Sequence, residues 1–202
     1  MNDQVCLLNM KKRKYTKSKR AELQNQTRER IIDAVVALHE ELGPANTSIK
    51  AVAERAGVQR LTVYRYFPDE DSMFMACTSK WFALNSPPQL SEWDAIDDAA
   101  QRSSAALMAF NQYYRGTEAM WQAVYRDINH VAAMQKPMAQ FEVYINQQHD
   151  DLLAAWKARG KKKQQLSLTL RHCLCFSTWQ SLKTEKLNDK QITELMMSWI
   201  IK

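Results

Sequence analysis

The sequence predicts an all-α protein of about nine helices, with an N-terminal helix-turn-helix domain of three helices before a larger helical C-terminal domain. Its 202 residues include only four Gly and five Pro. So few turn-forming residues argue against a sheet-rich fold and are typical of long helices joined by short connections. Apolar residues also recur at the spacing of one helix face along most of the chain.

The positive charge of the chain is concentrated in its N-terminal third. Residues 1–67 hold 13 of the 28 Lys and Arg residues but only 7 of the 22 Asp and Glu residues. The whole net charge of +6 therefore lies in this part, which we expect to face a polyanion. Residues 11–20 contain seven basic residues and no acidic one. We expect residues 1–22 to form a disordered basic arm, for which the alternative is a merely solvated tail.

Three helices are predicted within residues 23–68, and a fourth helix with a linker within 69–86. An apolar stripe marks the first helix, which ends at Gly43. A very short second helix breaks at Gly57, and a third runs from about Gln59 to Tyr66. Asp69 can then cap the fourth helix.

The two short helices joined through Gly57 have the layout of a helix-turn-helix, whose second helix enters the major groove of DNA. The sequence TSIKAVAERAGVQRLTVYRYFPDEDSMF, residues 47–74, resembles the DNA-binding signature of the TetR family. The matching features are the Ala-Gly-Val turn, the Thr-hydrophobic-Tyr-Arg-Tyr-Phe recognition helix and the Pro-acidic entry to the fourth helix. The resemblance implies a bacterial transcriptional regulator that binds double-stranded operator DNA. An ordinary amphipathic helical hairpin is the alternative.

The third helix presents an exposed set of side chains that fits a DNA groove, because two apolar residues take its core positions. Arg60 can pair with the O6 and N7 atoms of guanine, Gln59 can read adenine, and Leu61 can lie against a thymine methyl group. Hydroxyl groups can contact phosphates, and the resemblance implies that Lys50 reaches a base or a phosphate. The predicted DNA-binding residues are Ser48, Lys50, Gln59, Arg60, Leu61, Thr62, Tyr64 and Tyr66.

Two positions depart from the family pattern. Leu61 replaces a residue that is usually small, and Glu70 stands where the family commonly has a lysine that contacts phosphate. Because Glu70 reverses a charge near DNA, we do not expect that contact here. The basic arm can compensate by entering the adjacent minor groove or by adding phosphate contacts.

Residues 87–202 are expected to form the larger domain, because the segment 85–88 ends in two prolines that disfavour a helix. Its last helices are predicted over 162–183 and after Asn188. The helix over 162–183 carries two apolar stripes, one of which is best covered by a second copy of the same helices. The alternative is burial within its own domain. The expected homodimer interface comprises Leu168, Cys175, Trp179, Leu182, Leu195 and Trp199.

The resemblance also implies a cavity in this domain that binds a small molecule and changes the separation of the two DNA-reading domains. The domain is rich in aromatic residues and Met, although their periodicity alone indicates only a core. No buried charged cluster is predicted, which favours an apolar or aromatic effector. The candidate pocket residues are Phe110, Tyr114, Trp121, Tyr125, Phe141 and Phe176.

No catalytic residue, metal site or cofactor is predicted. The four histidines occur singly, and the consecutive residues His149, Asp150 and Asp151 fan out around a helix. The four cysteines lack the spacing of a metal site or a disulfide framework, so we expect reduced thiols in a cytoplasmic protein. No run of 18 apolar residues indicates a membrane span.

A repressor that binds a palindromic operator as a dimer and is released by a small-molecule effector is the favoured interpretation. The alternative is a DNA-binding regulator or architectural protein without an effector. An all-helical enzyme ranks third, because no nucleophile–base pair is evident.

Overall fold

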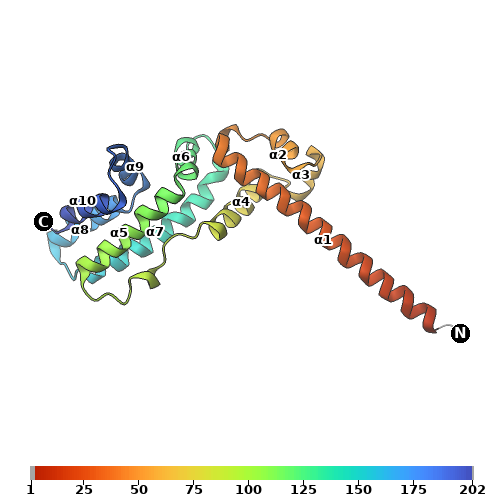
Figure 1. Cartoon of the computed structure of the whole chain (residues 1–202), viewed down its shortest axis with the longest axis horizontal. Coiled ribbons are helices and arrows are strands. Elements are labelled where there is room, and N and C mark those ends of the chain that lie inside the picture. Colours follow the sequence, from red (N-terminus) through yellow and green to blue (C-terminus); the bar gives the residue numbers. More distant parts are fainter. Residues whose placement is uncertain (1–2, 202) are drawn as a thin grey trace. The chain divides into compact units, whose positions relative to one another are not determined.

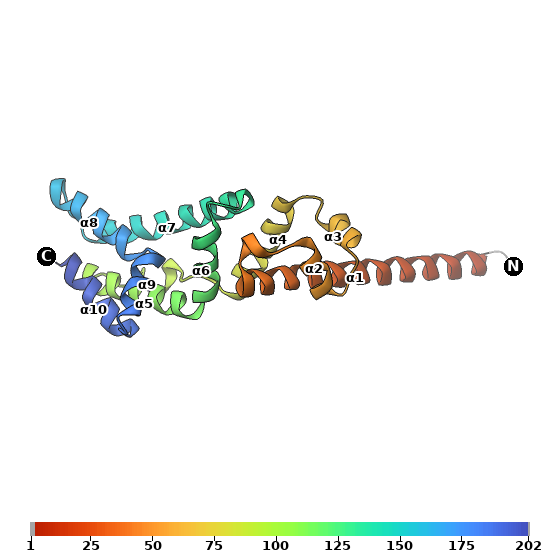
Figure 2. The ribbon, with the colours of Figure 1, turned by 90° about the horizontal axis from the view of Figure 1, so that it is seen from above.

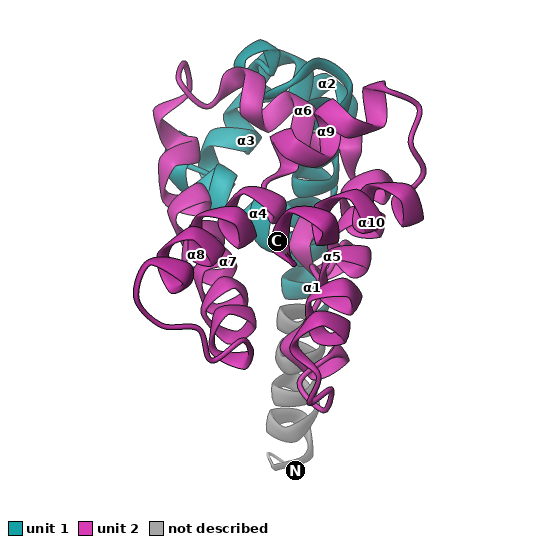
Figure 3. Cartoon of the chain, turned by 90° about the vertical axis from the view of Figure 1, so that its left-hand side faces the viewer, with its two compact units in different colours: residues 1–80 teal, residues 81–202 magenta. Residues whose placement is uncertain are grey.

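The computed structural model describes the backbone of residues 3–201 and the side chains of residues 19–201. The described residues contain ten α-helices, three short 3-10 helices and no strand (Figure 1). The predicted all-α class is therefore confirmed, with one α-helix more than expected. The chain divides into two compact units, residues 1–80 and 81–202 (Figure 3). The division falls inside α4, within the predicted connecting segment 69–86.

The first unit is built around the C-terminal half of its first helix. Ile31, Val35, Val52 and Val63 are all 0% exposed and form the centre of its core. The four positions come from three helices, so the helix-turn-helix is held by its own small hydrophobic core. The elements are α1 (Asp3–Leu42), η1 (Pro44–Asn46), α2 (Ile49–Ala56), α3 (Arg60–Tyr66) and α4 (Glu70–Leu84).

Helix α1 begins at Asp3, whereas the sequence predicted a disordered arm over residues 1–22. No Gly or Pro precedes Gly43, and the Lys, Arg, Leu, Gln and Glu residues of this segment are good helix formers. Helix propensity thus opposes the disorder that the charge run suggests. Gly43, with a φ of 87°, follows the end of the helix. The side chains of residues 1–18 lie outside the described part of the chain.

The second unit is a bundle in which α5 packs along α10 and against α7, while α8 contacts both α7 and α10 (Figure 2). Phe110, Leu152, Leu170 and Ile192 are 0% exposed at its centre. No helix among the described residues is long and apolar enough to cross a membrane. The elements are η2 (Leu90–Glu92), α5 (Ala99–Gly116), α6 (Glu118–Asp127), η3 (Ala132–Met134), α7 (Gln135–Ala155), α8 (Gly160–Cys173), α9 (Phe176–Thr184) and α10 (Asp189–Ile200).

The single helix predicted over 162–183 is wrong, because the chain breaks between α8 and α9. Cys175 has extended backbone angles (φ −77°, ψ 135°), and the side chains of two other residues accompany the break. The Thr178 hydroxyl donates to the His172 carbonyl at 2.7 Å, and the Tyr114 hydroxyl donates to the Leu174 carbonyl at 2.8 Å. These bonds satisfy carbonyls that a continuous helix would have paired internally.

The break also changes the position of Trp179, which we predicted in the dimer interface. Trp179 is 0% exposed within its own unit, with its ring centroid 5.6 Å from that of Phe176 and 6.1 Å from that of Tyr114. The guanidinium carbon of Arg115 and the amine of Lys183 each lie 5.7 Å from its ring centroid. Trp179 therefore belongs to the core, and its assignment to an interface is corrected.

Candidate DNA-binding surface

The turn between α2 and α3 is fixed by backbone geometry and by helix caps. Ser48 caps α2, since its hydroxyl accepts the Ala51 backbone N–H at 3.2 Å. Gly57 adopts left-handed angles (φ 64°, ψ 42°), which cost little only for glycine. The N–H of the next residue, Val58, returns to the Ala53 carbonyl at 2.9 Å. The direction in which α3 leaves α2 is thus set locally.

Helix α3 buries one face and exposes the other. Val63 is 0% exposed and Phe67, which caps its C-terminus, is 3% exposed. Leu61 is 78% exposed, the highest value among the exposed large hydrophobic residues. Thr62 and Tyr66 are half-buried, so they present less surface than predicted. The other predicted DNA-binding residues are exposed: Ser48, Lys50, Gln59, Arg60, Leu61 and Tyr64.

Three exposed arginines near this surface were missing from the predicted set. Arg65, in the last turn of α3, places its guanidinium carbon 5.3 Å from the Tyr66 ring centroid. From α1, the guanidinium carbon of Arg28 lies 5.3 Å from the ring centroid of Phe67. Arg30 extends a guanidinium nitrogen to within 3.9 Å of the position that a Cβ at Gly57 would take. Assigning every exposed residue of α3 to a face would have found Arg65, whereas the two α1 arginines depend on tertiary packing.

Charge pairs hold α2 and α4 against α1. The Arg55 guanidinium donates to both carboxylate oxygens of Glu41, at 2.8 and 2.6 Å. This pairing lowers the pKa of Glu41 and raises the pKa of Arg55. The Lys80 amine lies 2.5 Å from an Asp33 carboxylate oxygen and 2.9 Å from one of Glu29. Because their partners are within the unit, Arg55 and Lys80 position helices and are less available to a phosphate.

The start of α4 is acidic. The Asp69 carboxylate accepts the Ser72 backbone N–H at 2.7 Å, which lowers the pKa of Asp69 and makes it the helix cap that the sequence predicted. Glu70 and Asp71 follow in the first turn. Negative charge stabilises this end of a helix but repels phosphate, in agreement with the expectation that Glu70 does not contact DNA.

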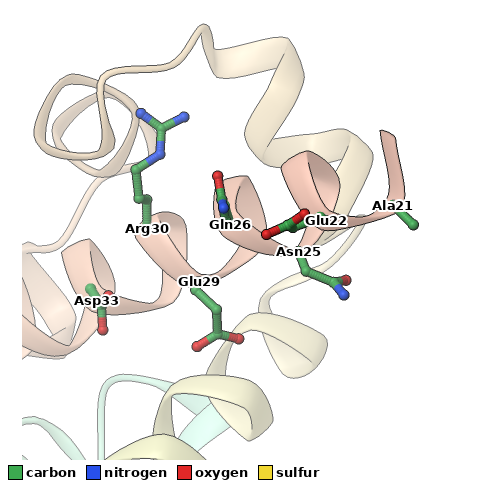
Figure 4. A pocket seen from close by; sticks show the side chains of 7 residues that line it. All are labelled: Ala21, Glu22, Asn25, Gln26, Glu29, Arg30 and Asp33. Carbon is green, nitrogen blue, oxygen red and sulfur yellow. The ribbon is translucent and has the colours of Figure 1, made fainter. Parts of the chain in front are cut away.

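A groove of about 870 Å³ runs along one side of α1 (Figure 4). Figure 4 shows Glu29 and Arg30 pointing to opposite sides of the helix. With Glu22, Glu29 and Asp33 among its seven lining residues, the groove carries more acidic than basic charge. It is therefore unsuited to a DNA backbone.

The six predicted pocket residues form one aromatic cluster in the second unit. The ring centroids of Trp121 and Phe141 are 4.5 Å apart, and the rings of Tyr125 and Phe176 stack at 5.5 Å with an interplanar angle of 10°. Tyr114 joins both halves of the cluster, at 6.1 Å from Trp121 and 5.5 Å from Phe176. Tyr125 is 40% exposed, and the other five residues are buried.

The cluster carries polar atoms that are nearly all neutral donors. Burial raises the pKa of Tyr125 to about 12, and raises the pKa of Tyr114 still further above its ordinary value. Trp121 is 2% exposed, and its indole N–H is buried without a hydrogen-bond partner that meets strict geometry. A ligand inserted here would meet aromatic faces and hydrogen-bond donors and would find no charge to pair with.

The structure brings together one Ser–His–Asp arrangement that the sequence did not predict. Ser167 Oγ lies 3.0 Å from His149 Nε2, and His149 Nδ1 lies 3.0 Å from an Asp150 carboxylate oxygen. The same Nε2 is also 3.1 Å from the Ser167 backbone carbonyl. Ser167 lies inside α8, where neighbouring N–H groups are committed to the helix and unavailable to an oxyanion. The contact therefore joins α7 to α8 and lacks the geometry of a nucleophile.

Residues 31–77 match the family model described as bacterial regulatory proteins, tetR family. Over 95 residues the chain is 37% identical to the HTH-type transcriptional repressor KstR of Mycolicibacterium smegmatis, which covers 47% of this chain and 40% of KstR. The chain spans 28% to 40% of the length of the curated KstR relatives that it matches.

Two solved structures share the fold of most of the chain. A TetR-like transcriptional regulator from Rhodococcus sp. RHA1 has a TM-score of 0.61 at 16% identity, over 86% of this chain and 93% of that one. RolR in complex with resorcinol has a TM-score of 0.51 at 20% identity, over 88% of this chain and 89% of RolR. By its matched helix-turn-helix region and its fold, the chain belongs to the tetR family of bacterial regulatory proteins.

Proposed function

We propose that this TetR-family regulator is a repressor that binds a two-fold symmetric operator as a homodimer and releases it when a small-molecule effector binds. The observation that carries the proposal is the exposed face of α3, where Gln59, Arg60, Leu61 and Tyr64 stand away from a buried apolar face. Guanidinium, amide and branched apolar groups on one short helix are suited to base edges in a major groove.

In this proposal the residues of α3 divide into base-reading and backbone-positioning groups. Arg60 pairs with guanine, Gln59 reads adenine, and Leu61 contacts a thymine methyl group. Tyr64 and Arg65 contact phosphates, as do Ser48 and Lys50 on the α2 side. Lys50 and Glu54 are only weakly paired, since the charged groups are 3.9 Å apart and both side chains are mostly exposed. An exposed pair of this kind contributes little and leaves Lys50 free to reach DNA.

The proposed dimer uses the last helices of the second unit. Leu168 of α8 is 68% exposed and Ile201 is 61% exposed, while Leu182, Leu195 and Trp199 are half-buried. A second copy related by a two-fold axis would cover these apolar groups. Two recognition helices would then meet major-groove sites about 34–36 Å apart, or at a multiple of that spacing.

A binding-site selection with a random DNA duplex library tests the DNA-binding proposal. The wild-type protein should select a palindromic sequence, whereas Arg60→Ala should select a motif with a relaxed preference at one symmetric pair of bases. The matched control is Arg126→Ala, because Arg126 is exposed and lies in α6 of the other unit. A wild-type protein that enriches no sequence would contradict the proposal.

The effector site is proposed to be the aromatic cluster, in agreement with its neutral donors and with the resorcinol bound by RolR. A regulator or architectural protein without an effector is the second candidate, and the close ring contacts within the cluster favour it. Thermal-shift measurements with aromatic compounds separate the two, since a ligand that binds the native state raises the melting temperature. An effector must also weaken operator binding, whereas an effector-free protein would respond to no compound in either assay.

A further inference from the structure

A groove that the proposed function does not use lies where α7, α8 and α10 meet in the second unit. Its volume is about 930 Å³, within the range of small-molecule sites. The aromatic cluster contributes none of its lining residues. These are Trp156, Lys157, Ala158, Lys162, Gln165, Leu166, Leu168, Thr169, Trp199 and Ile200.

The groove has two chemically different parts. Apolar side chains from three helices, including Trp156, Leu168 and Trp199, form one part. The Trp156 ring is held in place, because its indole N–H donates to the Ser103 hydroxyl at 2.9 Å. Two lysines, Lys157 and Lys162, contribute the other part. The site therefore combines a fixed apolar wall with positive charge.

The two groove lysines belong to a larger cation cluster in the connection from α7 to α8. Residues 157–163 contain five basic side chains and no acidic one, all exposed. Among the described residues, none of the five forms an ion pair with a carboxylate. Mutual repulsion, together with the positive end of the α8 dipole, makes this arrangement unfavourable. The cluster comprises Lys157, Arg159, Lys161, Lys162 and Lys163.

We infer that this groove binds an amphipathic organic anion, with a carboxylate between Lys157 and Lys162 and an apolar body along Trp156, Leu168 and Trp199. Charge complementarity favours an anion, because an occupant with a negative head relieves the repulsion among the lysines. A purely polar anion would leave the apolar wall in water, and a neutral apolar molecule would leave the cations unpaired. Gln165 and Thr169 supply further hydrogen-bonding groups for the head.

Calorimetric titration of the full-length protein with dodecanoate, dodecanol and acetate tests the inference. Dodecanoate should bind, while dodecanol and acetate should each bind at least about tenfold more weakly, because each lacks one of the two contacts. Raising the salt concentration should weaken dodecanoate binding, since the lysines are exposed and screened by ions. Equal affinity for dodecanoate and dodecanol would overturn the inference.

A double substitution separates this groove from the aromatic cluster and from nonspecific binding. Lys157→Gln with Lys162→Gln should weaken dodecanoate binding by about tenfold or more. The control pair, Lys136→Gln with Lys186→Gln, removes two exposed lysines outside the groove and should leave the affinity unchanged. Dodecanoate affinity that survives the first pair, or that falls equally in both, would overturn the inference. An absence of dodecanoate binding, as when a second copy covers the groove, would also overturn it.

Discussion

The hydroxyl of Tyr114, in α5, donates a hydrogen bond to the backbone carbonyl of Leu174 where the chain passes from α8 to α9. The two atoms are 2.8 Å apart, and both residues are 1% exposed. Water therefore has little access to replace the bond. The contact joins two segments 60 positions apart in the sequence at the place where a predicted helix is broken.

Replacing Tyr114 with Phe should lower the free energy of unfolding by about 1–3 kcal/mol, because a buried carbonyl loses its donor. Urea denaturation of the purified protein measures the change. Tyr64→Phe is the matched control, since the Tyr64 side chain is exposed and its hydroxyl can bond to water. Equal midpoints for the Tyr114 variant and the wild type would show that the hydrogen bond contributes no net stability.

Local signals account for what the sequence predicted correctly. Gly57 and Asp69 mark the turn and the fourth helix by their own backbone and side-chain chemistry, and Asn188 caps α10 through the Gln191 N–H at 2.9 Å. The α8–α9 break could not be predicted in this way, because it is accompanied by Tyr114, a residue distant in the sequence. Without the break, the periodicity of residues 162–183 placed Trp179 on a free face.

The candidate DNA-binding surface follows the same division. A helical wheel of α3 identifies most of its exposed face because Val63 fixes the buried side. Arg28 and Arg30 reach the neighbourhood of α3 only through the packing of α1, which no pattern within α3 reports. The six pocket residues could likewise be predicted as aromatic, while their contacts with one another required the fold.

Two substitutions distinguish the core of the second unit from its proposed dimer interface. Leu168→Glu should give folded monomers, because Leu168 is 68% exposed and a charge there opposes an apolar interface. Trp179→Glu should instead unfold the unit or destabilise it by more than about 3 kcal/mol, since it removes a core ring and buries a charge. Sedimentation velocity and circular dichroism give the two readouts. A folded, monomeric Trp179→Glu protein would restore Trp179 to the interface.

The pair between Glu41 and Arg55 predicts a specific pH dependence of stability. Arg55 lowers the pKa of Glu41 below its ordinary value of 4.5, so the unfolded state takes up this proton at a higher pH than the folded state. The stabilisation is therefore complete above pH 4.5 and is lost as the pH falls through the lower folded pKa. Glu41→Gln should be less stable than the wild type at pH 6, with a difference that shrinks in acid. A difference independent of pH would assign it to packing.

Removing residues 1–20 should weaken operator binding without changing the preferred sequence. This segment carries seven basic residues between positions 11 and 20, and cations that contact phosphates act mainly by releasing counterions. Each lost contact should reduce the slope of log K against log salt by about 0.9. Fluorescence anisotropy across a salt series measures the slope. An unchanged slope would show that the segment makes no phosphate contact.

Arg60 and Arg65 should differ in what their loss does to operator recognition. Arg60 opens α3 beside the 78%-exposed Leu61, so its guanidinium can enter the groove and pair with guanine. Arg65 lies at the other end of α3 with its guanidinium against the Tyr66 ring, which suits a phosphate contact. Arg60→Ala should cost roughly 1–3 kcal/mol per half-site and relax the preference at one symmetric pair of bases.

Arg65→Ala should weaken binding to all sequences about equally and reduce the salt slope by about 1. Binding-site selection and anisotropy on both variants separate base reading from positioning, because only a base-reading residue changes the selected motif. Tyr64→Phe serves as a third variant that keeps the ring and removes a hydroxyl proposed to contact phosphate, so it should resemble Arg65→Ala in kind. If Arg60→Ala returns the wild-type motif at lower affinity, Arg60 contacts phosphate and base reading must belong to Gln59, Leu61 or another exposed residue of this surface.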